Sequence, residues 1–232
     1  MKPLIFAGAL ALLLNCSNKT EDDIELKDDI KPDGHIQVVS GEGTTYNITE
    51  AEGEKDLGWL VRNQDKEDAW IFFDGRWVDT GFDESFDYVI QSINFILKKI
   101  AEYPGSERLV SQYHIHPNYH CNPPSHTDIF FSININRILA EHGITVVYKV
   151  IDPSGVWTYS VTPQMESSLA SQPGKEVNLR IGIVNASYDT LFERCGNRDA
   201  ADENIPAEDI ENYIQRMDGL GVVINHRPFE TE

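Results

Sequence analysis

The chain has 232 residues, of which 38 are acidic and 19 are basic, giving a net charge of −19 with neutral His. Because 41% of the residues are hydrophobic and 10% are aromatic, the chain can form a core and is not disordered throughout. The excess of acidic residues argues against a nucleic-acid-binding protein and against electrostatic docking on anionic lipid, since both need a basic surface.

The first 34 residues are expected to lie outside the folded domain. After a basic residue, the apolar segment Leu4–Leu14 is too short to span a bilayer. It ends in Leu-Leu-Asn-Cys at Cys16, which resembles the lipobox of bacterial lipoproteins. The resemblance implies a signal peptide at residues 1–15, a lipidated Cys16 and a polar tether through residue 34. It places the protein in the bacterial cell envelope, and the Ser after the Cys favours the outer membrane or cell surface.

Residues 35–232 are expected to form one domain that begins with short strands. The β-branched and aromatic segments between turn residues predict strands at Ile36–Ser40, Thr44–Thr49, Leu57–Arg62, Ala69–Phe73 and Arg76–Val78. Apolar residues then recur at steps of three and four, which predicts an amphipathic helix over residues 84–102.

The second half of the chain alternates between strand and helix patterns. The expected order is a strand at Arg108–His114, a helix at Thr127–His142, strands at Ile144–Ile151 and Val156–Thr162, a candidate strand at 176–184, a helix at Pro206–Met217 and a last strand at Leu220–Asn225. This order predicts an α/β or α+β fold in which helices flank a mixed sheet. The remaining cysteines, Cys121 and Cys195, are a candidate disulfide in an oxidising compartment, although the sequence does not show that they meet.

The segment YHIHPNYHCNPPSHTD at residues 113–128 carries the residues most suited to chemistry. His114 and His116 are two residues apart at a strand end, so both rings face the same side of the sheet. Ser125 stands where a helix N-cap is expected, and Asp128 lies in the first turn of that helix. Two imidazole nitrogens, a carboxylate oxygen and a water would complete a tetrahedral zinc site with one open position.

This pattern of HxHP, a short loop and SxxD resembles the motif of the JAMM (MPN/JAB) zinc metalloproteases. The resemblance covers about residues 45–162 and implies a cytidine-deaminase-like core. It implies that His114, His116 and Asp128 bind Zn²⁺ and that Ser125 donates a hydrogen bond to the oxyanion. One departure is the loop between His116 and Ser125, which has eight residues where the family usually has seven.

The family also has a glutamate just before a Gly-hydrophobic strand, and this residue acts as the general base. If Gly58–Val61 is that strand, Glu54 is the matching residue, although it lies four positions before the glycine rather than three. Glu50, Glu52 and Glu67 remain alternatives.

The sequence leads to two hypotheses about function. The first is a lipid-anchored zinc metallopeptidase that hydrolyses peptide or isopeptide bonds of a peptide or protein substrate in the cell envelope. The alternative is a lipoprotein that keeps the JAMM fold as a binding module without catalysis, as the displaced glutamate and the longer loop suggest. A cupin-like barrel needs a Glu soon after the second His, and residues 117–140 contain none.

Overall fold

The computed structural model describes residues 45–82, 90–102, 108–117, 121–172, 174–187, 191 and 206–229. The predicted signal peptide, the lipidation site Cys16, the tether, the strand expected at Ile36–Ser40 and Cys195 lie outside these ranges. Within them the chain forms a seven-stranded mixed sheet, a two-stranded sheet and six helices. The predicted class, a mixed sheet flanked by helices, is confirmed.

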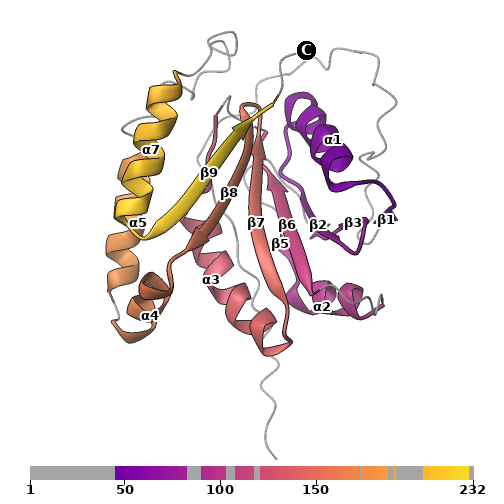
Figure 1. Ribbon diagram of the computed structural model, residues 1–232, viewed down its shortest axis with the longest axis horizontal. Coiled ribbons are helices and arrows are strands. Elements are labelled where there is room, and N and C mark those ends of the chain that lie inside the picture. The colour runs from indigo at the N-terminus through magenta and orange to yellow at the C-terminus, as the bar shows by residue number, and fades with distance from the viewer. Residues whose placement is uncertain are drawn as a thin grey trace, which may run out of the picture.

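The large sheet places the strand that carries the histidines near its centre (Figure 1). Its order is β1 (Thr45–Tyr46), β3 (Arg76–Asp79), β2 (Ala69–Phe73), β6 (Leu109–Ile115), β7 (Thr145–Asp152), β8 (Gly155–Val161) and β9 (Val222–Pro228). Strands β6 and β7 are parallel, and the other neighbouring pairs are antiparallel. The small sheet pairs β4 (Gly81–Phe82) with β5 (Ile90–Gln91).

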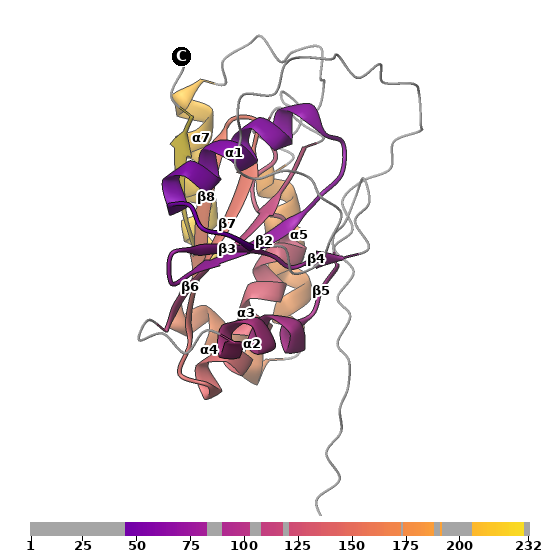
Figure 2. The ribbon, with the colours of Figure 1, turned by 90° about the vertical axis from the view of Figure 1, so that its right-hand side faces the viewer.

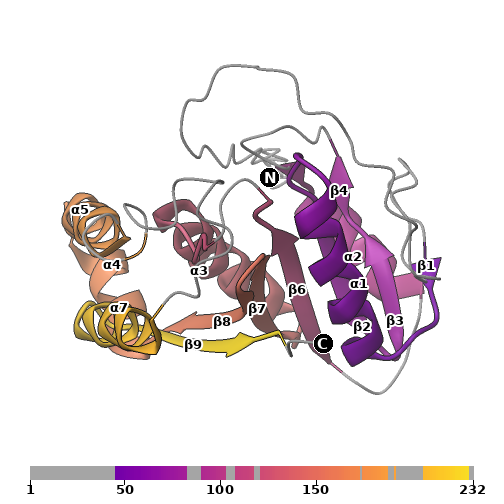
Figure 3. The same ribbon diagram turned by 90° about the horizontal axis from the view of Figure 1, so that it is seen from above.

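Helices cover both faces of the large sheet. They are α1 (Glu50–Asn63), α2 (Ile93–Glu102), α3 (His126–Glu141), α4 (Pro163–Ser171), α5 (Lys175–Ser187) and α7 (Ala207–Gly219). Figure 1 shows α3 behind β7 and β8 and α1 at the upper right, and Figure 2 shows strands β2 and β3 between α1 and α2. Seen from above, α3, α5 and α7 lie together, away from α1 (Figure 3).

Two hydrophobic clusters correspond to these two faces. The larger cluster joins α2, α3, α5 and α7 to the sheet, and the smaller one joins α1 to the other face. Strand β6 contributes Val110 to the larger cluster but Tyr113 and Ile115 to the smaller one. Because side chains alternate along a strand, His114 faces the α3 side while Tyr113 faces α1.

The predicted strand at Leu57–Arg62 is wrong, since these residues belong to α1. Thr49 caps this helix: its side chain accepts from the backbone N–H of Glu52 at 3.2 Å, and the Glu52 carboxylate accepts from the Thr49 N–H at 2.8 Å. This reciprocal capping box fixes a helix start. Leu57, Leu60 and Val61 are buried with helical spacing, so a short apolar run that also fits a strand is here one face of a helix.

Three other elements also differ from the prediction. The candidate strand at 176–184 lies in helix α5, whose buried Leu179, Ile183 and Ala186 are spaced by four and three residues. Helix α4 was not expected, although Thr162 caps it and Pro163 occupies its first turn, a standard start signal. Helix α2 begins only at Ile93, because Ile90–Gln91 forms strand β5. The other strands and helices predicted within the described ranges are confirmed to within a few residues.

Candidate metal centre

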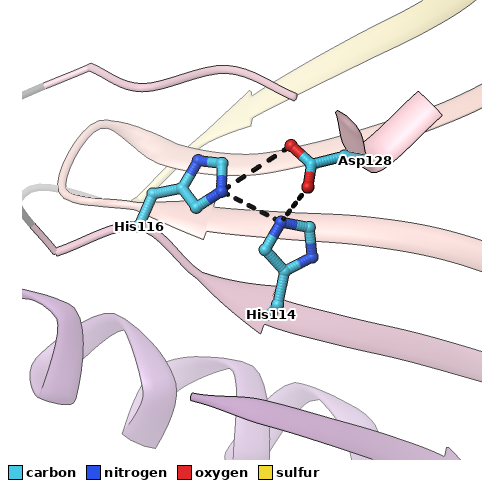
Figure 4. Close-up of side chains that lie close together, drawn as sticks. All are labelled: His114, His116 and Asp128. Atoms are coloured by element: carbon cyan, nitrogen blue, oxygen red, sulfur yellow. Dashed lines mark hydrogen bonds and ion pairs between the residues drawn. The ribbon is translucent and has the colours of Figure 1, made fainter. Parts of the chain in front are cut away.

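Strand β6 and helix α3 bring His114, His116 and Asp128 together, as the motif predicted (Figure 4). The His116 N–H donates to the Ile151 carbonyl at 2.8 Å, so pairing with β7 continues past the end of β6 and keeps both rings on one face. The two Nε2 atoms lie 2.9 Å apart. Asp128 Oδ1 lies 3.1 Å from His114 Nε2, and Oδ2 lies 3.7 Å from His116 Nε2.

The start of α3 orients the carboxylate. Ser125 is the N-cap: its Oγ accepts from the Asp128 N–H at 3.3 Å, and its own N–H donates to Asp128 Oδ2 at 2.5 Å. The SxxD spacing is therefore a capping box, in which Ser and an acidic residue satisfy the first free N–H groups of the helix. In this arrangement Asp128 Oδ1 faces His114 and Oδ2 faces His116.

The second nitrogen of His116 fixes its protonation. His116 Nδ1 lies 2.8 Å from the backbone oxygen of Asn122, which can only accept, so Nδ1 carries the proton and Nε2 presents a lone pair to the cluster. Burial, together with the neighbouring charge of His114, lowers the pKa of His116 to about 4, so this ring is neutral at pH 7. Burial opposes ionisation of Asp128, but His114, His116 and the Ser125 hydrogen bond outweigh it and hold its pKa below the usual range.

The three side chains could hold a metal ion. They are 1–2% exposed, and one ligand atom from each lies within 4.8 Å of the others. Ligand atoms at zinc bond lengths and tetrahedral angles lie about 3.3 Å apart. The two Nε2 atoms are 2.9 Å apart, and Asp128 Oδ1 is 3.1 Å from His114 Nε2, both slightly below this value. The 3.7 Å from His116 Nε2 runs to the other carboxylate oxygen, Oδ2. The donor set of two imidazoles and one carboxylate, with a fourth position open, is the composition of catalytic zinc sites.

Glu67 lies beside this cluster. It is 2% exposed, and its Oε1 is 4.0 Å from His116 Nε2. The Ile115 N–H donates to the Asp68 carbonyl at 3.0 Å, which ties the chain just before β2 to the end of β6. Glu67 was one of the alternatives for the general base. The sequence signal for it is its position two residues before the predicted strand at Ala69–Phe73.

The structure does not bring Glu54 to the cluster. Glu54 lies on α1, where its Oε1 accepts from the Tyr113 hydroxyl at 2.7 Å and from Lys149 Nζ at 2.8 Å, and its Oε2 accepts from Arg227. Tyr113 faces the opposite side of β6 from His114, so the sheet separates Glu54 from the histidines. The match that favoured Glu54 assumed a strand at Gly58–Val61, and this segment is helical.

The loop before α3 is held at several points. Cys121 and Asn122 are buried, the Asn122 N–H donates to Asp152 Oδ2 at 2.6 Å, and the Tyr213 hydroxyl donates to the Pro124 carbonyl at 3.4 Å. No pattern in the sequence indicated that Asn122 contacts His116 or that Asp152 supports this loop. The predicted Cys121–Cys195 disulfide is not tested, because Cys195 lies outside the described residues.

The described part of the chain contains no helix that is both long and apolar enough to cross a bilayer. No protein-family model matches the chain, and no curated protein matches it in sequence.

Proposed function

We propose that the protein is a zinc-dependent peptidase of JAMM type that hydrolyses peptide or isopeptide bonds. The observation that carries the proposal is the convergence of His114, His116 and Asp128 in one buried cluster, with the carboxylate of Glu67 4.0 Å from His116. This set contains a ligand triad and a separate acid–base group, which together are what metal-assisted hydrolysis needs.

In this proposal His114 Nε2, His116 Nε2 and Asp128 Oδ1 hold the ion. Bound zinc would polarise the substrate carbonyl and lower the pKa of a water molecule. The Asn122 carbonyl keeps the proton of His116 on Nδ1, so Nε2 is available without a protonation change. The capping hydrogen bonds from Ser125 hold the Asp128 carboxylate in place.

Glu67 takes the role first given to Glu54. As general base it accepts a proton from the attacking water, and as general acid it passes that proton to the leaving amine. Ser125 is partly exposed at the start of α3, so its hydroxyl can donate to the oxygen of the carbonyl under attack while its lone pair accepts from the Asp128 N–H.

The lipobox resemblance extends the proposal to location and substrate. A chain lipidated at Cys16 would act on peptides or proteins of the bacterial cell envelope, with the outer membrane or cell surface favoured. The alternative of a non-catalytic binding module was motivated by a displaced glutamate and a longer loop. The argument from a displaced glutamate is weaker now, because the buried Glu67 does lie beside the cluster of His114, His116 and Asp128.

The test measures zinc content and cleavage of a peptide library in the same preparations. The unaltered protein is expected to contain one zinc per chain and to cleave peptides, and His116→Ala is expected to lose both properties. Glu67→Gln should keep zinc and lose about 100- to 10,000-fold in cleavage rate, the usual contribution of a general base. Glu54→Gln is the matched control and should keep both zinc and activity. Zinc binding without cleavage of any peptide would favour the binding module.

A further inference from the structure

A buried carboxylate outside the ligand triad lies behind His116. Asp152, the last residue of β7, is 0% exposed. Burying a carboxylate is costly unless its oxygens are well hydrogen-bonded. Asp152 accepts five such bonds, which its two oxygens divide between two different parts of the chain.

The first oxygen serves the turn between β7 and β8. Asp152 Oδ1 accepts from the Ser154 N–H at 2.8 Å, from the Ser154 hydroxyl at 2.6 Å and from the Gly155 N–H at 3.0 Å. An Asp that bonds the backbone two residues ahead is an ordinary turn residue. These three bonds satisfy the local role of Asp152 and leave its second oxygen for another purpose.

The second oxygen reaches the loop that follows the histidines. Asp152 Oδ2 accepts from the Asn122 N–H at 2.6 Å and from Trp157 Nε1 at 2.8 Å. The carbonyl of Asn122 in turn accepts from His116 Nδ1 at 2.8 Å. Asn122 is therefore fixed on both sides, by Asp152 through its N–H group and by His116 through its oxygen.

We propose that Asp152 is a positioning residue of the metal centre, which acts on His116 through the backbone of Asn122. By holding the Asn122 carbonyl in place, Asp152 keeps the His116 proton on Nδ1 and keeps the Nε2 lone pair aimed at His114 and Asp128. The outer partners of a metal-bound His set its tautomer and ring orientation in this way. The inference rests on the proposed metal site for its consequence but not for its geometry.

Asp152→Asn tests the proposal, because an amide has one acceptor oxygen and cannot serve both the turn and Asn122. Ser154→Ala is the control: it removes one bond to Oδ1 and leaves the bond to Asn122 intact. Zinc affinity is measured by competition with a chelator on full-length protein whose circular dichroism is unchanged. Asp152→Asn is expected to bind zinc about 10- to 100-fold more weakly, whereas Ser154→Ala should stay within about threefold of the unaltered protein, since its link to His116 is intact.

A second readout needs no metal and no enzyme activity. The ¹⁵N shifts of His116 in the metal-free protein report its tautomer, which should be Nδ1–H in the unaltered protein and in Ser154→Ala and mixed in Asp152→Asn. If the protein binds no zinc, a changed tautomer in Asp152→Asn still supports the positioning role while the proposed function fails.

An Asp152→Asn protein that folds with unchanged zinc affinity and unchanged His116 tautomer would overturn the inference. If this variant does not fold, hydrogen exchange on the unaltered protein decides. Protection of the Asn122 amide supports the bond to Asp152, and exchange at the rate of an open loop contradicts it.

Discussion

Replacing Glu54 by Gln separates the corrected site from the one that the sequence suggested. Glu54 is 7% exposed and accepts hydrogen bonds from Tyr113, Lys149 and Arg227. In the structure these contacts attach α1 to the sheet on the face away from the histidines. The substitution should therefore lower stability and leave metal binding and catalysis unchanged.

The size of the effect follows from the partners. Gln keeps an oxygen that can accept hydrogen bonds from Tyr113 and Lys149. Because this amide oxygen is uncharged, the hydrogen bond from Lys149 loses about half its strength, or about 1 kcal/mol. The Arg227 side chain is 62% exposed, so its ion pair contributes at most about 1 kcal/mol. The unfolding free energy should fall by about 1–2 kcal/mol in total, which is about 2–8 °C in Tm for a chain of this length.

Urea denaturation followed by circular dichroism measures this change, and zinc content and peptide cleavage are measured on the same samples. Asp65→Asn removes one negative charge at an exposed site just after α1 and should change stability by less than about 0.5 kcal/mol. If Glu54→Gln abolished cleavage at unchanged stability, Glu54 would be the general base, and the assignment of α1 to the opposite face of the sheet would be refuted.

Three further perturbations test the centre and its surroundings. Removing zinc with EDTA should lower Tm by about 5–10 °C, since a ligand at 100 times its Kd stabilises by about 2.7 kcal/mol; an unchanged Tm in scanning calorimetry would contradict a bound metal. Ser125→Ala removes the cap of α3 and should cost about 1 kcal/mol in urea denaturation, so an unchanged midpoint would mean that the cap is not formed. Burial lowers the pKa of His226 to about 4. The unfolded chain therefore takes up this proton at a higher pH than the folded chain, and stability should fall as the pH drops from about 6.5 to 4. Replacing His226 by Phe should make that fall shallower, and identical pH profiles would contradict the burial argument.

The three residues of the candidate metal centre could be predicted because their sequence signals are local. The alternation of β6 places His114 and His116 on one face whatever the strand pairs with, and the Ser125–Asp128 spacing fixes a helix start from four residues. The Pro-containing loop between the histidines and this helix start is short, which keeps the end of the strand and the start of the helix close to each other. Strands β7 and β8 could also be predicted, because a turn of Asp, Pro, Ser and Gly separates two segments rich in β-branched residues.

The glutamate that lies beside the candidate centre could not be identified from the sequence, because the identification depends on whether a short apolar run forms a helix or a strand. Leu57–Val61 satisfies the pattern of a strand and of a helix, and only the cap at Thr49 and the packing against β7 decide for the helix. With that segment misread as the strand, the family pattern pointed to Glu54. What separates Glu54 from Glu67 is the face of the sheet on which each carboxylate lies, and this depends on the tertiary structure. The roles of Asn122 and Asp152 are likewise visible only once residues 30 positions apart are in contact.

The contrast between Glu54 and Asp128 is itself an argument for a cation. Both carboxylates are buried, but Glu54 forms ion pairs with Lys149 and Arg227. In the described part of the chain the ion-pair partners of Asp128 are the two histidines, and His116 is neutral at pH 7 because burial lowers its pKa to about 4. Asp128 thus faces two imidazoles rather than the Lys and Arg side chains that pair with Glu54, and a metal ion held between the three side chains would stabilise the carboxylate directly. On one face of the sheet, Glu54 is neutralised by basic side chains of the protein. On the other face, Asp128 and the two histidines converge on a position suited to a divalent cation.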